Sequence, residues 1–362
     1  MIDFQNKRAL VVTAILLLLL PLLLQSMGNF WVRTADMALL YVLLALGLNI
    51  VVGFAGLLDL GFVAFFAIGA YLYGLMASPH LAETFEWFAQ VFPNGLHTPI
   101  WLVIPLAALL AGIFGILLGA PTLKLRGDYL AIVTLGFGEI IRVFMNNLDH
   151  PVNITNGPKG LGQIDGITVL GVPLAKPLEI GGFTLSSVTL YYYLFMVLVV
   201  ASVIICHRLE LSRIGRAWMA IREDEIAAKA MGINTRNMKL LAFGMGATFG
   251  GVSGSMFAAF QGFISPESFS LMESVMIVAM VVLGGIGHLP GVILGAVLLS
   301  ALPEVLRWVS GLLDLQALTG GRLDAAILRQ LLIALAMIII MLMRPRGLWP
   351  SPEHGKSLAK TA

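Results

Sequence analysis

Charge is scarce in this chain. Only 12% of the 362 residues are Asp, Glu, Lys or Arg, whereas soluble proteins carry roughly 25%. Hydrophobic residues make up 59%, and the formal net charge of +2 is too small to support an argument for nucleic-acid binding. The composition therefore predicts an all-α, polytopic membrane protein in which residues 1–362 form one integral membrane domain.

Cysteine is nearly absent, and catalytic motifs are missing. Cys206 is the single cysteine, which excludes an internal disulfide and a cysteine-based metal site. The sequence has no GxxxxGK[ST] phosphate loop and no HExxH motif, and its six histidines are scattered. These absences predict a chain that is not an enzyme, needs no cofactor or metal, and takes its energy from another protein.

Long hydrophobic runs, by contrast, are abundant. A helix that crosses a bilayer needs about 20 mostly apolar residues, and the sequence supplies about ten such segments. The first is longer than a signal-peptide core and lacks a small-residue cleavage site, which predicts a retained span. The ten candidates are 9–28, 35–54, 58–77, 99–120, 128–148, 189–207, 240–262, 273–289, 291–310 and 324–343.

The basic residues cluster on one face of this ten-span arrangement. By the positive-inside rule that face is cytoplasmic, so we expect both termini and the 208–239 loop in the cytoplasm. The opposite loops, 78–98, 149–188 and 263–272, contain few Lys and Arg residues. The basic residues that set the orientation are Lys7, Arg8, Lys124, Arg126, the seven within 208–239, Arg344, Arg346, Lys356 and Lys360.

The 208–239 loop contains a short predicted helix with both ends marked. Asp224 can cap its first turn, and Gly232 can adopt the left-handed conformation that ends a helix. Glu225 and Lys229 are spaced to pair at i, i+4. Such a helix could dock on a partner protein, or the basic loop could lie on anionic lipid headgroups. Its apolar ridge consists of Ile226, Ala227, Ala230 and Met231.

Charged residues also interrupt the apolar runs. Glu139 and Arg142 lie at i, i+3 in the fifth span, where a lone charge is costly, so they are predicted to pair. The alternative is a gate or cavity wall that meets a substrate amine or a neighbouring subunit. Asp59 is expected to be a turn or cap residue.

Glycine is common in the membrane segments and predicts close helix packing. The VVLGGIGHLPG stretch, residues 281–291, is expected to interrupt a helix, as a tight turn or as a re-entrant break.

Several stretches together resemble the LivM-type permease subunits of bacterial high-affinity branched-chain amino-acid ABC importers. The similarity covers most of the chain from about Tyr41. It rests on GDYLAIVTLGFGEIIR (127–142), GRAWMAIREDEIAAKAMGI (215–233), QGFISPESFSLMES (261–274), VVLGGIGHLPGVILGA (281–296) and RPRGLWP (344–350).

The resemblance implies an importer of leucine, isoleucine and valine in the bacterial inner membrane. It implies a second, LivH-type permease, two cytoplasmic ATPase subunits and a periplasmic amino-acid-binding protein as partners. It also implies that the 225–232 helix is the coupling helix, although Glu225 stands one residue earlier than in the usual motif and the downstream Ile-x-Leu-Pro is absent. That helix comprises Glu225, Ile226, Ala227, Ala228, Ala230, Met231 and Gly232.

The binding protein would meet the 149–188 and 263–274 loops, with Glu267 and Glu273 as candidate contacts. Two other functions stay open. One is a proton-coupled secondary transporter that uses Glu139 and Asp59 as a relay. The other is an ABC permease for urea or short amides.

Overall fold

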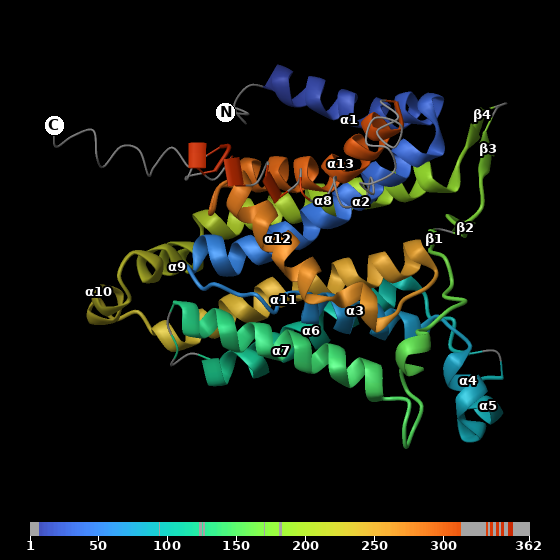
Figure 1. Cartoon of the computed structure of the whole chain (residues 1–362), viewed down its shortest axis with the longest axis horizontal. Coiled ribbons are helices and arrows are strands. Elements are labelled where there is room, and N and C mark those ends of the chain that lie inside the picture. Colours follow the sequence, from blue (N-terminus) through green and yellow to red (C-terminus); the bar gives the residue numbers. More distant parts are fainter. Residues whose placement is uncertain are drawn as a thin grey trace, which may run out of the picture.

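The computed structural model describes residues 7–312 except 94, 123, 124, 126, 170, 181 and 182, together with 331, 334, 335, 338, 339, 342, 343 and 347–349. Most of the helices run side by side along the longest axis of the molecule (Figure 1). They are α1 (Lys7–Met27), α2 (Asn29–Leu48, continued by a π-helix Asn49–Phe54), α3 (Val63–Met76), α6 (Ile100–Thr122), α7 (Asp128–Asn147), α8 (Ser187–Leu211), α11 (Thr235–Gln261), α12 (Leu271–Gly284) and α13 (Leu289–Leu312).

Six helices within the described residues are long and apolar enough to cross a membrane. This confirms a helical, multi-pass membrane protein, as the composition predicts. The six segments are Asn29–Phe54, Ile100–Thr122, Ser187–Leu211, Thr235–Gln261, Pro266–Gly284 and Leu289–Trp308.

The predicted count of about ten spans is not confirmed. The third candidate, 58–77, is shortened to the 14 residues of α3, because residues 55–62 form a loop. Gly56 has a positive φ of 69° there, and the Asp59 carboxylate accepts a 2.8 Å hydrogen bond from the Gly61 amide. The tenth candidate, 324–343, lies mostly outside the described residues.

The two ends of the bundle carry different structures (Figure 1). At one end, the α10 end, lie α9 (Arg213–Glu223) and α10 (Glu225–Ala230). The other end, the hairpin end, has two short antiparallel hairpins that an all-α prediction misses, β1 (Thr168–Val169) with β2 (Val172–Pro173) and β3 (Leu178–Ile180) with β4 (Phe183–Leu185). It also has short helices at His80–Thr84 (α4), Glu86–Val91 (α5), Gly157–Lys159 and Pro266–Phe269.

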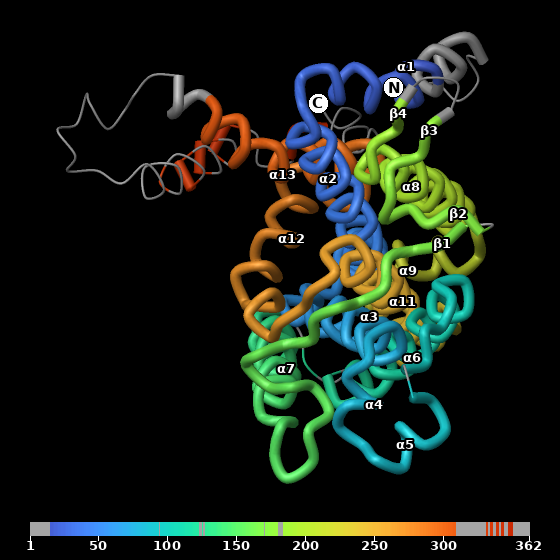
Figure 2. Tube along the Cα trace, turned by 90° about the vertical axis from the view of Figure 1, so that its right-hand side faces the viewer, coloured from blue at the N-terminus to red at the C-terminus, as the bar shows by residue number. Residues whose placement is uncertain are grey.

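Helix α11 lies in the centre of the bundle, next to α3 and α6 (Figure 2). Its glycines let backbones meet: a Cβ added to Gly254 would lie 2.0 Å from the Phe66 carbonyl oxygen, and one added to Gly69 of α3 would lie 2.0 Å from that of Gly251. Lipid supplies no hydrophobic force between helices, so such close contact is what holds them together. The predicted packing role of the glycines is confirmed here.

We expect Gly254→Ala to lower the free energy of unfolding by about 1–3 kcal/mol or more, because backbone atoms rather than flexible side chains must move. Gly136→Ala in α7 is the matched control, since a Cβ there meets nothing within 4 Å. The measurement is the thermal transition of the detergent-solubilised protein, followed by size-exclusion chromatography. Equal transitions for the two variants would contradict the packing argument.

Candidate functional site

Helix α10 has the two predicted end signals. The Asp224 carboxylate accepts hydrogen bonds from the amides of Ile226 and Ala227 at 2.8 and 3.0 Å, as a helix N-cap does. Gly232 has a φ of +86°, and its amide donates to the Lys229 carbonyl oxygen at 3.1 Å. The local sequence thus fixes both ends of a helix that spans only six residues.

The predicted apolar ridge lies on the outside of the molecule. Ile226 is 70% exposed and Met231 83% exposed, and Ala227 and Ala230 are exposed beside them. Ala228, on the opposite side of α10, is buried. Large apolar side chains that protrude together from a loop indicate a surface that contacts another molecule.

Glu225 connects α10 to the bundle. Its carboxylate lies 2.7 Å from the ammonium group of Lys239, a buried residue in the second turn of α11. The i, i+4 spacing predicts Lys229 as the partner of Glu225. In the structure Glu225 pairs with Lys239 instead, and Lys229 is exposed. An ion pair to a buried lysine fixes geometry, because removing the glutamate leaves the Lys239 charge in a poorly solvated place. The 225–239 pair therefore holds α10 in a defined position on α11.

Arg222, at the end of α9, connects α10 to the membrane helices. Its guanidinium donates a hydrogen bond to the carbonyl oxygen of Gly53, at the end of the π-helix, and lies against Gly287 between α12 and α13. The amide of Gly287 in turn donates to the buried Asn49 side chain at 2.9 Å. Burial lowers the pKa of Arg222 from its ordinary value, but the group stays charged at any physiological pH.

A third segment joins the same place. The amides of Leu348 and Trp349 donate to the carbonyl oxygens of Leu283 and Gly284 at 2.8 and 3.1 Å. We call the assembly of residues 49–56, 284–288, 347–349 and Arg222 the glycine junction. At this junction, residues 285–288 make a tight connection between α12 and α13, with Gly285 and Gly287 at positive φ.

Glu139 and Arg142 pair on α7, with 3.0 Å between the Arg142 Nε and a Glu139 carboxylate oxygen. Arg142 also lies 3.6 Å from the carboxylate of Glu267, in the Pro266–Phe269 turn. The side chains of Glu139 and Arg142 are about one-third exposed, whereas that of Glu267 is 73% exposed. Glu267 thus lies at the surface of the hairpin end, where its predicted contact with a partner protein stays a prediction.

We expect Arg142→Ala to reduce stability more than Glu139→Ala, because the arginine left by the second change still has Glu267 nearby. The double change should cost less than the sum of the two, with a coupling of about 0.5–3 kcal/mol. Thermal unfolding of the four proteins in detergent measures this, and Glu86→Gln, at an exposed position in α5, serves as the surface control. Additive losses would show that the pair is not coupled.

Glu273 lies in the first turn of α12, where its carboxylate accepts a 3.0 Å hydrogen bond from the Tyr41 hydroxyl. The predicted contact of Glu273 with a binding protein is not tested by this geometry.

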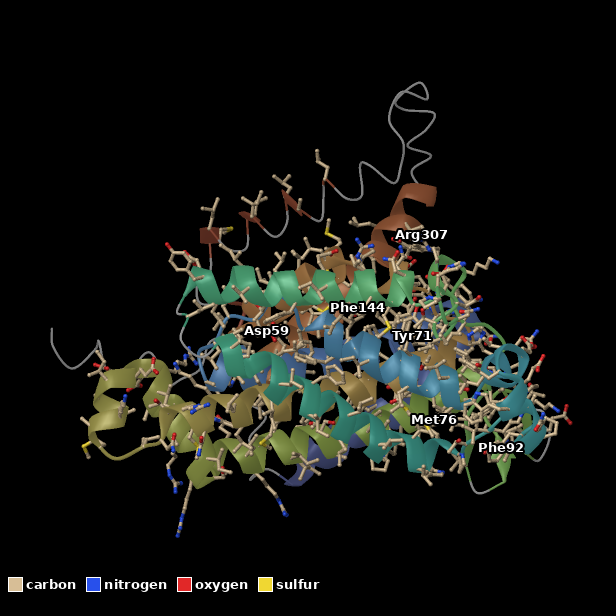
Figure 3. The ribbon with its side chains drawn as sticks, turned by 90° about the horizontal axis from the view of Figure 1, so that it is seen from below. Asp59, Tyr71, Met76, Phe92, Phe144 and Arg307 are labelled. Carbon is tan, nitrogen blue, oxygen red and sulfur yellow. The ribbon has the colours of Figure 1, made fainter. Side chains whose placement is uncertain are left out.

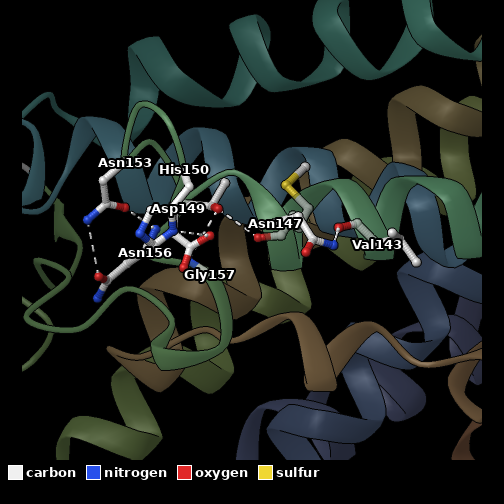
Figure 4. A network of polar contacts seen from close by, with 9 residues as sticks. Val143, Asn147, Asp149, His150, Asn153, Asn156 and Gly157 are labelled. Carbon is white, nitrogen blue, oxygen red and sulfur yellow. Dashed lines mark hydrogen bonds and ion pairs between the residues drawn. The ribbon is translucent and has the colours of Figure 1, made fainter.

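The loop after α7 is held by its own amide side chains (Figure 4). The Asn153 side chain accepts from the Asn156 amide at 2.9 Å, and the Asn156 side chain donates to the Gly160 carbonyl oxygen at 2.8 Å. The Thr155 hydroxyl ties the loop to α7 through the Met145 carbonyl oxygen, at 2.6 Å. The loop is therefore a preformed surface at the hairpin end.

Comparison with known proteins identifies the kind of molecule. Residues 31–342 match the model of the family described as the branched-chain amino acid transport system / permease component. The chain belongs to this permease family. It is 40% identical to the high-affinity branched-chain amino acid transport system permease protein LivM of Escherichia coli, over 88% of this chain and 70% of that protein.

The chain is also similar, less closely, to two further permease proteins. The permease is 24% identical to LivH of Salmonella typhimurium, over 87% of this chain and 93% of LivH. It is 31% identical to the autoinducer 2 import system permease protein LsrC of Yersinia enterocolitica, over 41% of this chain and 44% of LsrC. No solved structure matches the chain.

Some polar residues that shape this permease are absent from the predicted site. Arg222 and Lys239 link the 208–239 loop to the helices, and Asn49 accepts from the Gly287 amide beside Arg222. Asp36 is buried in α2 with no hydrogen-bond partner for either carboxylate oxygen among the described residues. Asp36 and Asn49 could have been flagged as polar residues within an apolar run. Arg222 and Lys239 are hidden among the other basic residues of their loop.

Proposed function

We propose that this chain is a LivM-type permease subunit of a bacterial ABC importer that moves leucine, isoleucine and valine across the inner membrane. Separate ATPase subunits supply the energy, and a periplasmic binding protein delivers the amino acid. The identity to LivM supports the cargo. The observation that carries the energy coupling is α10, a capped helix with an exposed apolar ridge that is tied to the bundle through Glu225 and Arg222.

The partner permease is of the LivH type. The match to LivH over most of both chains supports two related permeases that descend from one ancestor and assemble as a pair. Two cytoplasmic ATPases then dock on the coupling helices, one on each permease. The coupling helix of this chain comprises residues 225–232.

The α10 end faces the cytoplasm in this proposal. α1 runs toward the hairpin end (Figure 1), so its start at Lys7 lies nearer the α10 end than its finish does, which agrees with a cytoplasmic face that holds both the basic N-terminal residues and the basic 208–239 loop. The hairpin end, with Glu267, then faces the periplasm and the binding protein.

We expect Arg236→Cys, in a Cys206→Ser background, to react with a membrane-impermeant maleimide only after the inner membrane is permeabilised. Gln90→Cys in α5, at the opposite end, should react in intact spheroplasts. Both positions are exposed, so a difference in labelling reports the side of the membrane rather than burial. Labelling of Arg236→Cys in intact spheroplasts would invert the orientation.

The function is tested with the complete complex in proteoliposomes. Leucine uptake should require ATP inside the vesicles together with the binding protein outside, and a proton gradient alone should drive none. Uptake on a gradient alone would favour a proton-coupled transporter that uses Asp59, whose second carboxylate oxygen is buried with no hydrogen-bond partner among the described residues, together with Glu139. Uptake of urea or short amides in place of leucine would reassign the cargo.

A further inference from the structure

A cavity of about 420 Å³ lies between α2, α12 and α13 near the hairpin end. Its volume is in the range of roughly 300–1,000 Å³ that small-molecule sites have. Figure 3 shows one of its residues, Arg307, at the end of the molecule opposite the helices of the 208–239 loop. The cavity is separate from the groove beside Glu139, Arg142 and Glu267.

The cavity carries charges of both signs. Arg33 and Arg307 contribute guanidinium groups, and Glu273 and Glu304 contribute carboxylates. The Arg307 guanidinium lies 2.9 Å from Glu304, and Tyr41 donates its hydroxyl to Glu273 at 3.0 Å. The two positive and two negative charges of the cavity sum to zero. A ligand with a single charge of either sign therefore gains little electrostatic attraction by binding there.

The remaining wall is apolar and adaptable. Met37, Met276, Met280 and Leu299 line it. Thioether side chains are flexible and polarisable, so one pocket can fit apolar groups of different branching. This wall distinguishes the cavity from a site for a small polar ion.

We propose that this cavity is a transit site for a zwitterionic amino acid with an apolar side chain. Arg33 and Arg307 would receive the carboxylate, because guanidinium groups form paired hydrogen bonds with carboxylates. Glu273, oriented by the Tyr41 hydroxyl, would receive the ammonium group, and the methionine wall would receive the side chain. The inference rests on the proposed function, which names such amino acids as the cargo.

A molecule with only one of the two charges binds less well in this site. Leucinamide lacks the carboxylate that would meet the exposed guanidinium groups, and 4-methylpentanoate lacks the ammonium group that would meet the half-buried Glu273. Each therefore loses the charge-assisted hydrogen bonds on one side of the cavity, and these are stronger than hydrogen bonds between neutral groups. Selectivity for the zwitterion is therefore the property that a general apolar crevice would not show.

The experiment measures protection of a cysteine in the cavity. Ser300→Cys, in a Cys206→Ser background, places a thiol in the wall with little change of shape. The complete transporter in nanodiscs, without binding protein or ATP, is treated with a methanethiosulfonate reagent. L-leucine at about ten times its Kd should slow modification about tenfold, because only the empty site reacts. Leucinamide and 4-methylpentanoate at the same concentration should leave the rate unchanged.

Two variants serve as controls. Ser268→Cys, next to Glu267 and away from this cavity, should react at the same rate with and without leucine. Glu273→Gln keeps the shape of the side chain but removes its charge, so it should abolish the protection of Ser300→Cys. Leucine-independent modification of Ser300→Cys would overturn the transit site, and so would a thiol that never reacts because the second permease covers it.

Failure of the transit site is distinct from failure of the proposed function. ATP-driven leucine uptake is measured in the same preparation. If the wild-type complex transports no leucine, the proposed function fails. If wild type and Glu273→Gln transport leucine equally well and no protection is seen, the transit site alone is wrong.

Discussion

Met231→Asp is expected to abolish the association of this chain with its ATPase subunits. Met231 is 83% exposed in the isolated chain, at the end of the ridge on α10, so the change should not disturb the fold. Burial of an unpaired carboxylate against a partner costs several kcal/mol. A central interface residue typically contributes about 2–4 kcal/mol or more, and each 1.4 kcal/mol is a tenfold change in affinity. ATPase retained on the affinity-tagged permease is the measurement.

Lys229→Gln is the matched control, since it removes a charge from the same short helix without touching the ridge. The association of the Lys229→Gln variant with the ATPase subunits should stay at the wild-type level. Gly232→Ala should have an intermediate effect. A Cβ there meets nothing within 4 Å, so the cost is only that of a non-glycine residue at φ +86°, about 1–2 kcal/mol. Normal retention of the ATPase by Met231→Asp would remove α10 from the interface.

The ends of α10 were predictable because their signals are local. Asp224 and Gly232 act on amides and carbonyls within three residues of themselves, and sequence records such short-range chemistry directly. The partner of Glu225 was not predictable in this way. Lys239 is fourteen positions away and on another helix, whereas Lys229 has the favourable helical spacing. The turn between α10 and α11 brings Lys239 next to Glu225, and this turn determines which of the two lysines forms the ion pair.

In the membrane helices, too, some features were predictable from the sequence and others were not. Apolar runs locate the helices α6, α8 and α11 well, because a window of hydrophobic residues is what a bilayer selects. The start of α3 differs because Gly56, Asp59 and Gly61 turn the chain within an apolar run. The hairpins between residues 168 and 185 have two- or three-residue strands, too short for an alternating pattern to stand out.

The glycine junction joins residues that are far apart in the sequence. It gives the second prediction with a large expected effect. Arg222→Gln is expected to leave the ATPase bound but to uncouple ATP hydrolysis from leucine uptake. α10 keeps its cap, its ridge and the Glu225–Lys239 pair in this variant, so docking is intact. What is lost is the guanidinium that holds the Gly53 carbonyl oxygen and fills the space beside Gly56 and Gly287.

A hydrogen bond from a charged donor contributes about 1.5–3 kcal/mol, and a buried carbonyl without a donor costs a similar amount. Without that connection, movement of α10 is no longer carried to the breaks at residues 53–62 and 285–288. The measurement is leucine transported per ATP hydrolysed in proteoliposomes, which should fall at least about tenfold if the loss exceeds 1.4 kcal/mol.

Arg222→Lys should recover part of this ratio of leucine to ATP, because it restores the charge without the planar donor. Arg236→Gln, at an exposed position in the first turn of α11, should keep the wild-type ratio. An unchanged ratio in Arg222→Gln would show that α10 acts on the membrane helices through the Glu225–Lys239 pair and α11 instead.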